Sequence, residues 1–103
     1  MPNPPSFNEQ CYQLLLQIPI GKVVSYSDIA HALNGKAYQA VGNAMAANPN
    51  LIDIPCHRVV KSNGEIGNYA LGISKKIALL QSEGIKVENS QVVDFKKVRF
   101  QFR

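Results

Sequence analysis

The sequence predicts a small α/β domain that contains a helix-turn-helix. The chain has 103 residues, 46% of them apolar, which suits one globular domain with its own core. Helical patterns at residues 26–33 and 37–47 are joined by Asn34-Gly35, a dipeptide that supplies left-handed backbone for a tight turn. An extended segment at 22–25 and an alternating tail at 98–103 predict strands. We therefore expect one domain over residues 1–103.

Serine residues mark the expected starts of three helices. Ser6 is followed three positions later by Glu9, and Ser25 by Asp28, which is the spacing of a capping box. Ser74 can cap a third helix. These helices are expected at about residues 7–18, at 26–33, and between Ser74 and Gly84. The helix at 37–47 ends at Asn48-Pro49, because the residue before a proline avoids helical backbone.

The C-terminal tail has the pattern of an edge strand. Val98, Phe100 and Phe102 alternate with polar residues, as on a strand with one buried face. Four basic residues lie here, Lys96, Lys97, Arg99 and Arg103, in a chain of net charge +4 and pI about 9.2. Such a charge favours a polyanionic partner only weakly. A solvated strand face explains the basic cluster at least as well.

Composition argues against several other classes of protein. No run of about eighteen apolar residues is present, so no membrane span is expected. Residues 1–6 have neither the charge nor the apolar stretch of a signal peptide. Cys11 and Cys56 do not make a disulfide framework, which favours an intracellular setting, cytoplasmic in a prokaryote or nuclear in a eukaryote. Together with His31 and His57 they show no metal-ligand spacing, so we expect no metal.

The most informative stretch is residues 54–60, IPCHRVV. A thiolate is the reactive form of cysteine, and a nearby histidine lowers the pKa of the thiol. Neighbours on extended backbone point to opposite sides, so Cys56 and His57 can meet only if the chain turns or a water bridges them. Pro55 suits a strand that runs into such a turn. On this adjacency alone, an inert buried cysteine beside an ordinary histidine is the better interpretation.

Further motifs change that interpretation. They occur in order at residues 18–26 (IPIGKVVSY), 40–45 (AVGNAM), 48–49 (NP), 67–69 (GNY) and 79–84 (LLQSEG). Together with residues 54–60 they resemble the active-site domain of the 6-O-alkylguanine-DNA alkyltransferases, or methylated-DNA–protein-cysteine methyltransferases. The resemblance implies a winged helix-turn-helix of the alkyltransferase C-terminal domain type. Its core would cover residues 7–85, and a C-terminal strand and tail would follow at 86–103.

The same resemblance implies a single-turnover repair reaction without a cofactor. Cys56 would accept the alkyl group, usually methyl, from the O6 oxygen of guanine in DNA. His57 would deprotonate Cys56 through a bridging water, and Glu83 would orient His57, as in other activated nucleophiles. Asn48 would hold the turn that carries the cysteine, and as a helix stop it could do both jobs. Arg58 is expected to form a structural ion pair.

The resemblance also implies how damaged DNA would be bound. The base must leave the stack to be reached. Its pocket would be formed by Tyr26, the backbone around Cys56 and Val59, and the loop with Tyr69 and Ala70. The second helix would enter the minor groove, which carries little sequence information, with Ala37, Tyr38, Gln39, Ala40 and Gly42 near the DNA. Close packing of its small residues on a neighbouring helix is an equally good explanation.

Two departures keep a second function open. Gln39 stands where the family usually has an arginine that fills the gap left by the flipped base. The tail and the length resemble the alkyltransferase-like proteins, which bind alkylguanine without repairing it and carry tryptophan in place of the cysteine. The rival interpretation is thus a lesion sensor, expected to be a monomer like the enzyme, that recruits excision-repair proteins. An ordinary helix-turn-helix regulator is disfavoured, because the second helix lacks base-reading side chains.

Overall fold

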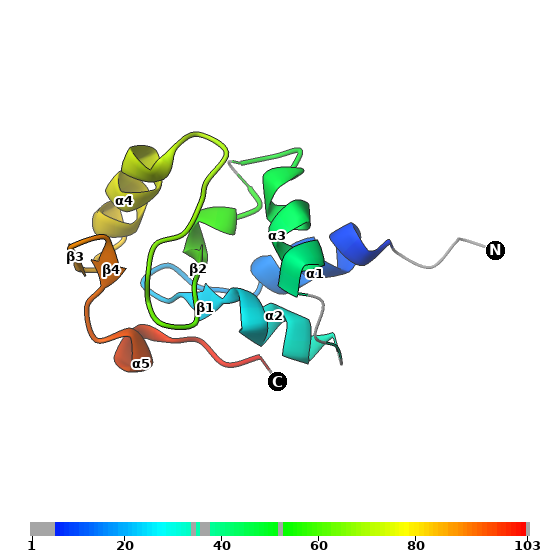
Figure 1. The fold of residues 1–103 in the computed structure, drawn as a ribbon, viewed down its shortest axis with the longest axis horizontal. Coiled ribbons are helices and arrows are strands. Elements are labelled where there is room, and N and C mark those ends of the chain that lie inside the picture. The colour runs from blue at the N-terminus through cyan, green and yellow to red at the C-terminus, as the bar shows by residue number, and fades with distance from the viewer. Residues whose placement is uncertain (1–5, 34, 36–37, 52, 103) are drawn as a thin grey trace.

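The computed structural model describes residues 6–33, 35, 38–51 and 53–102 (Figure 1). Its helices are α1 (Phe7–Leu15), α2 (Tyr26–Ala32), α3 (Tyr38–Ala46), α4 (Ile73–Ser82) and α5 (Phe95–Val98), with a 3₁₀ turn, η1, at Cys56–Arg58. Its strands are β1 (Val24–Ser25), β2 (Val59–Val60), β3 (Val87–Glu88) and β4 (Gln91–Val92). This content agrees with the expected small α/β class. Asn34 and Ala37, which the sequence placed in the turn and at the DNA, lie outside the described residues.

Two short strands at the centre bring distant segments together. β1 and β2 are parallel, with Val24 opposite Val59 and Ser25 opposite Val60. α2 begins directly after β1, and β2 begins directly after η1. The start of α2 therefore lies beside the residue that directly follows β2, Lys61, in the same segment of chain that carries Cys56 before β2. α2 and α3 pack against each other, and in Figure 1 α3 and α4 lie on opposite sides of the β1–β2 pair.

The first two helices begin where the sequence predicted. Ser6 Oγ accepts a hydrogen bond from the Glu9 amide at 3.1 Å. At α2 the capping box is complete, because Ser25 Oγ accepts from the Asp28 amide at 3.0 Å and Asp28 Oδ2 accepts from the Ser25 amide at 2.9 Å. α1, expected to reach residue 18, ends at Leu15. Its last residues take the tighter i→i−3 bonding that often closes a helix before a proline.

The start of α4 corrects the sequence prediction. The helix begins at Ile73 with Gly72 as its N-cap, not at Ser74. Gly72 has a positive φ of 97°, and its carbonyl accepts the first helical bond, from the Lys76 amide at 3.1 Å. The glycine conformation thus decides the start, although serine is the better capping residue in general. Gly84, with φ of 88°, follows the helix end as predicted.

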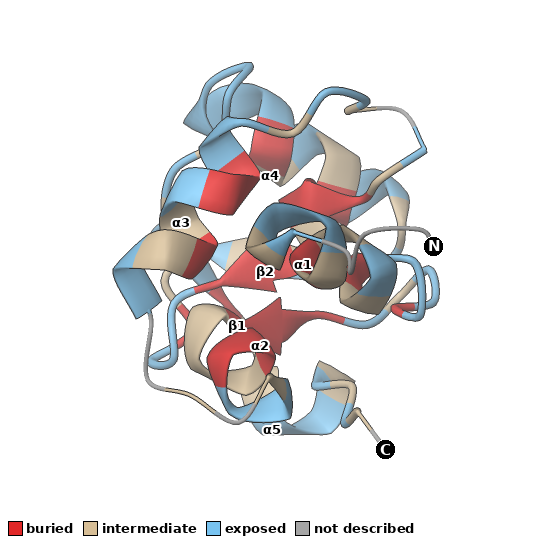
Figure 2. Ribbon diagram, turned by 90° about the vertical axis from the view of Figure 1, so that its right-hand side faces the viewer, coloured by how far each residue is buried: buried red, intermediate tan, exposed pale blue. Residues whose placement is uncertain are grey.

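The buried side chains form two clusters. The larger joins α1, α2, α3, η1, β1 and β2, and the smaller lies between β2, α4 and the β3–β4 hairpin. Figure 2 shows the buried residues along β1, β2 and the inward sides of the helices. The smaller cluster consists of Val23, Val60, Ile66, Leu80, Ile85 and Val92. In the part of the chain that the structure describes, no helix is long and apolar enough to cross a membrane.

The tail is not the regular strand that its alternation predicted. It forms the short helix α5 and then a single parallel bridge between Arg99 and Val23. Phe100 and Phe102 still pack against the larger cluster. Arg99 Nε donates to Asp28 Oδ2 at 2.9 Å, and a second bond joins the same two side chains. Arg99 is therefore used within the fold, where it braces the start of α2, and Arg103 lies outside the described residues.

Candidate functional site

Cys56 lies at the start of η1, where the chain turns into β2. Its side chain is buried, with 4% of the residue exposed. Asn48 Nδ2 donates to the Ile54 carbonyl at 2.9 Å, and Asn48 Oδ1 accepts from the Asn50 amide at 2.9 Å. The Asn48 side chain thus joins the end of the α3 segment to the backbone just before Cys56. The turn required for a Cys56–His57 site is present, and the Asn48 side chain holds the backbone that enters it.

The surroundings of Cys56 keep the resting thiol protonated. Burial raises the pKa of Cys56, because the charged thiolate loses its hydration. A hydrogen bond from Asn48 and the positive charge of Lys76 act in the opposite direction without cancelling the effect of burial. Both of these groups favour the thiolate. They would therefore stabilise it once a base has removed the proton.

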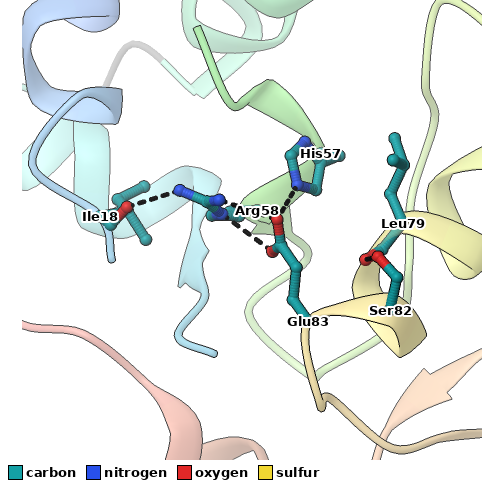
Figure 3. A network of polar contacts seen from close by, with 6 residues as sticks. All are labelled: Ile18, His57, Arg58, Leu79, Ser82 and Glu83. Atoms are coloured by element: carbon teal, nitrogen blue, oxygen red, sulfur yellow. Dashed lines mark hydrogen bonds and ion pairs between the residues drawn. The ribbon is translucent and has the colours of Figure 1, made fainter. Parts of the chain in front are cut away.

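Glu83 connects His57 and Arg58 at the end of α4 (Figure 3). His57 Nε2 lies 3.0 Å from Glu83 Oε2. Arg58 donates to both carboxylate oxygens, from Nε at 2.9 Å and from Nη2 at 2.7 Å, and its Nη1 donates to the Ile18 carbonyl at 2.7 Å. The structural ion pair expected for Arg58 is confirmed. It places the carboxylate where the sequence interpretation needed it, against the histidine.

The charges of this network determine the state of His57. Burial alone would raise the pKa of Glu83, but hydrogen bonds from Arg58 and His57 outweigh it and the net pKa is lowered. An ionised carboxylate can only accept, so His57 carries its proton on Nε2. Burial lowers the pKa of His57, and Glu83 offsets this only in part. The imidazole is therefore neutral near pH 7, with the lone pair of Nδ1 available as a base.

Nδ1 of His57 is buried and has no hydrogen-bond partner among the described protein groups. A buried polar atom without a protein partner calls for an explanation, and a catalytic role or an ordered water is among the usual ones. Nδ1 is the ring nitrogen that the sequence interpretation needs for a water-bridged contact with Cys56. Because Nε2 is bonded to Glu83, Nδ1 is the one ring nitrogen of His57 that can accept a proton.

A pocket of about 590 Å³ opens above Cys56. It is lined by Tyr26, Tyr38, Gln39, Gly42, Asn43, Met45, Ala46, Cys56, Lys61, Asn68, Tyr69 and Ala70. The expected substrate contacts Tyr26, Tyr69 and Ala70 thus lie together with the thiol, as do Tyr38, Gln39 and Gly42 of α3. Val59 is fully buried and Ala40 is half-buried. Neither lines the pocket.

The structure adds Lys76, which the sequence interpretation missed. Its side chain is fully buried, and Nζ donates to the Val59 carbonyl at 2.6 Å and to the Asn68 carbonyl at 3.0 Å. It therefore joins β2 to the loop that lines the pocket. Burial lowers its pKa to about 8. The signal was its helical spacing, four residues before the buried Leu80, which places Lys76 on the inward face of α4.

Asn43 and Lys61 are two further pocket residues that the sequence interpretation missed. Asn43 had a readable signal, because it follows Gln39 by four residues and so shares its face of the helix. Lys61 had none, since it follows β2 in an exposed turn. Among the described residues, no group of three or more His, Cys, Asp or Glu side chains could hold a metal ion.

Comparisons with known proteins agree with this geometry. The family model described as "6-O-methylguanine DNA methyltransferase, DNA binding domain" matches residues 6–85. A methylated-DNA–protein-cysteine methyltransferase of Saccharolobus solfataricus is 46% identical over 81 residues, which is 79% of this chain and 52% of that protein. A bifunctional methyltransferase/endonuclease of Picrophilus torridus is 43% identical over 90 residues, 86% of this chain and 30% of that protein. The chain thus spans about a third to a half of these relatives.

Solved structures show the same similarity. O6-methylguanine-DNA methyltransferase from Pyrococcus kodakaraensis is 45% identical with a TM-score of 0.71, over 77% of this chain and 46% of that one. Mycobacterium tuberculosis OGT in complex with DNA is 37% identical with a TM-score of 0.74, over 80% and 51%. S. pombe Atl1 shares the fold, with a TM-score of 0.82 at 24% identity over 92% and 94% of the two chains. The chain belongs to the methylated-DNA–protein-cysteine methyltransferase family of DNA-repair proteins, of which residues 6–85 match the DNA-binding domain.

Proposed function

We propose that the protein repairs DNA by moving an alkyl group, typically methyl, from the O6 oxygen of guanine to Cys56. The transfer is irreversible and occurs once per molecule. The observation that carries this proposal is the position of the Cys56 thiol in the pocket, directly before a neutral His57 that is hydrogen-bonded to Glu83. A nucleophile, a base and a group that orients the base are the parts that covalent catalysis needs.

The reaction starts with removal of the thiol proton. Nδ1 of His57 accepts it through a bridging water, and the negative charge of Glu83 stabilises the imidazolium that forms. The thiolate then attacks the alkyl carbon in one displacement: the S–C bond forms while the bond between carbon and O6 breaks. Guanine leaves as an anion and takes up one proton, so a thiol and an alkylguanine become a thioether and guanine. No metal or cofactor takes part in these steps.

The proposed DNA partner is a duplex with the damaged base turned out into the pocket. Tyr26, Tyr69, Ala70 and the backbone around Cys56 and Val59 would surround the base. α3 would lie in the minor groove with Tyr38, Gln39, Ala40 and Gly42 toward the DNA. The exposure of Tyr38 and Gln39 supports this orientation. So does the M. tuberculosis relative, whose structure contains DNA.

Intact-mass measurement after incubation with O6-methylguanine duplex DNA tests the proposal. We expect one added methyl group per molecule, located on Cys56 by peptide mapping and absent from Cys56→Ala. Cys11 is an internal control, because it is a second free cysteine whose side chain is fully buried in the core. A methyl group on Cys11, or no methyl group in spite of tight binding, would contradict the proposal.

Tight binding without transfer would instead support the lesion sensor. Gln39 at the pocket keeps this second function open, because it is shorter than the family's usual arginine and carries no charge to fill the gap left by a flipped base. Atl1, whose structure contains damaged DNA with O6-carboxymethylguanine, shares the fold of this chain. Excision-repair proteins would then be the partners. Enzyme and sensor share every DNA contact proposed above, so the mass of the protein separates them.

A further inference from the structure

We propose that Lys61 binds a DNA backbone phosphate beside the extruded nucleotide. The site would be formed by the Lys61 ammonium at the mouth of the pocket, next to the Tyr26 hydroxyl. This inference rests on the proposed binding of a flipped base, which it deepens by naming a contact to the sugar-phosphate chain. It does not require alkyl transfer, so it applies to a repair enzyme and to a sensor.

The parallel strand pair places Lys61 beside Tyr26. Ser25 is paired with Val60, and the next residues on the two chains are Tyr26 and Lys61. Gly67 lies against both side chains: a Cβ at Gly67 would be 3.2 Å from the Tyr26 hydroxyl and 3.6 Å from Lys61 Cγ. The lysine stem and the tyrosine hydroxyl therefore meet the same glycine at one side of the pocket.

Lys61 has a fixed backbone and a loosely held charge. Its amide donates to the Glu65 carbonyl at 2.8 Å, and its carbonyl accepts from the Gly64 amide at 2.9 Å. The side chain is 55% exposed, and its ammonium is 3.6 Å from the Glu65 carboxylate, which is 46% exposed. Exposed ion pairs of this kind contribute little and exchange partners readily. The ammonium can therefore turn to another anion without a change in the fold.

The chemistry of the pocket points to phosphate as that anion. Among the described residues that line the pocket, Lys61 alone carries a formal charge. Gln39 is uncharged, and the buried ammonium of Lys76 is bonded to two backbone carbonyls. An alkylated guanine is neutral, so the anion that a flipped nucleotide brings to the pocket mouth is its phosphodiester. A lysine ammonium binds phosphate as a point charge, without demanding a particular geometry.

Salt dependence of DNA binding is the first test, with Lys61→Gln compared with Lys86→Gln. Lys86 is exposed in the segment between α4 and β3, so its variant makes the same change in net charge away from the pocket. For a duplex with one O6-methylguanine, and with Cys56→Ala in every protein so that transfer does not consume the lesion, Lys61→Gln should reduce the slope of log K against log salt by about 1, as expected for one lost phosphate contact. Lys86→Gln should change the slope much less. Equal changes would overturn the assignment.

Neutral methylphosphonate links at single positions next to the lesion locate the contact. At one position the substitution should weaken binding by the Cys56→Ala protein with Lys61 in place about fivefold, in line with the loss of one charge-assisted bond at an exposed site. Lys61→Gln should show no further loss there, because both changes remove the same interaction. If the losses of affinity from the neutral link and from Lys61→Gln added up at every position, the proposal would be overturned.

Glu65→Gln should change the DNA affinity in the opposite direction to Lys61→Gln. It removes the carboxylate that competes for the ammonium, so binding should tighten. All of these readouts are equilibrium affinities of proteins that carry Cys56→Ala, and methylation is measured separately with Cys56 in place. A protein that shows them but never gains a methyl group would contradict the proposed transfer and still support the phosphate site. A protein that is methylated normally but lacks these effects would support transfer and overturn the role of Lys61.

Discussion

Nε2 of His57 lies 3.0 Å from Oε2 of Glu83, although the two residues are 26 positions apart in the chain. The same carboxylate is held by Arg58, which neighbours His57 in η1. Glu83 therefore joins the end of α4 to the turn that carries Cys56. Its carboxylate contacts the proposed base and compensates a half-buried arginine, so the fold and the proposed chemistry share one side chain.

Replacement of Glu83 by glutamine should damage stability and transfer together. Arg58 would keep its charge in a poorly hydrated environment without a counter-ion. Removing one partner of a buried ion pair lowers the unfolding free energy by about 3 kcal/mol. Urea denaturation measures this loss, and single-turnover alkylation with free O6-benzylguanine measures the rate. Glu65→Gln is the matched control, since it breaks an exposed ion pair and should cost at most about 1 kcal/mol. A Glu83→Gln protein with wild-type stability and rate would contradict this view of the network.

The rate of transfer should rise with pH above neutrality. The pKa of Cys56 is raised by burial, so more of the thiolate forms as the pH increases toward that value. The pKa of His57 is lowered by burial, so it is protonated, and lost as a base, only below the ordinary histidine range. Single-turnover rates with free O6-benzylguanine over a pH series measure both parts of this profile: the alkaline limb, which reports Cys56, and the acid limb, which reports His57.

Asn48→Ala provides the control for this pH profile. The Asn48 side chain favours the thiolate by hydrogen bonding, so its loss should move the alkaline limb to higher pH. The acid limb belongs to His57 and should stay in place. A shift of the alkaline limb to lower pH would show that Asn48 does not favour the charged form of Cys56.

Lys76→Met should change how stability depends on pH. The pKa of Lys76 is lowered by burial to about 8 in the folded protein, against about 10.4 for a free lysine. Between these values the unfolded chain binds more protons, so Lys76 makes stability rise with pH there. The unfolding free energy of the wild type minus that of Lys76→Met should therefore increase by about 2 kcal/mol from pH 7 to pH 10.

Lys75→Met is the natural control for this measurement, because Lys75 is the exposed neighbour on the same helix. The unfolding free energy of the wild type minus that of Lys75→Met should be the same at pH 7 and pH 10. Subtracting each variant from the wild type at the same pH also cancels the effect on stability of the tyrosines and cysteines that titrate in this range. An equal difference at pH 7 and pH 10 for Lys76→Met would show that the lysine is better hydrated than its burial indicates.

Gln39→Arg should favour duplex DNA as a substrate. Gln39 is exposed at the pocket, and an arginine there can stack and bond in the gap left by the flipped base. The ratio of the rate on duplex DNA to the rate on free alkylguanine should rise, because the free base needs no flipping. Gln17→Arg adds the same charge at an exposed position after α1 and should leave the ratio unchanged.

Equal effects of Gln39→Arg on both substrates would show that Gln39 does not fill the gap. Tyr38 would then be the next candidate. Its hydroxyl lies 3.4 Å from Nε2 of His31 on α2, which holds the ring toward the preceding helix and makes it the weaker candidate at present. Tyr38→Ala would test that alternative with the same two substrates.

Local signals in the sequence determined the helix starts at Ser6 and Ser25 and the turn after α4 at Gly84. A helix cap depends on a side chain and a backbone amide three residues away, so it can be recognised from a few neighbouring residues of the sequence. The ordered motifs around Cys56 were also sufficient to predict the family and the fold. Ser74 failed as a cap because a neighbouring glycine had a backbone conformation that offered an earlier start.

The tertiary structure alone decided several of the charge contacts. The family resemblance implied that Glu83 lies against His57, but only long-range contact gave Arg58 to Glu83, backbone carbonyls to Lys76 and Asp28 to Arg99. The tail alternation was real, since Phe100 and Phe102 face the core, yet it produced a single bridge in place of a strand. Pairing and pKa shifts depend on the three-dimensional surroundings of a group, and those surroundings come from segments far apart in the chain.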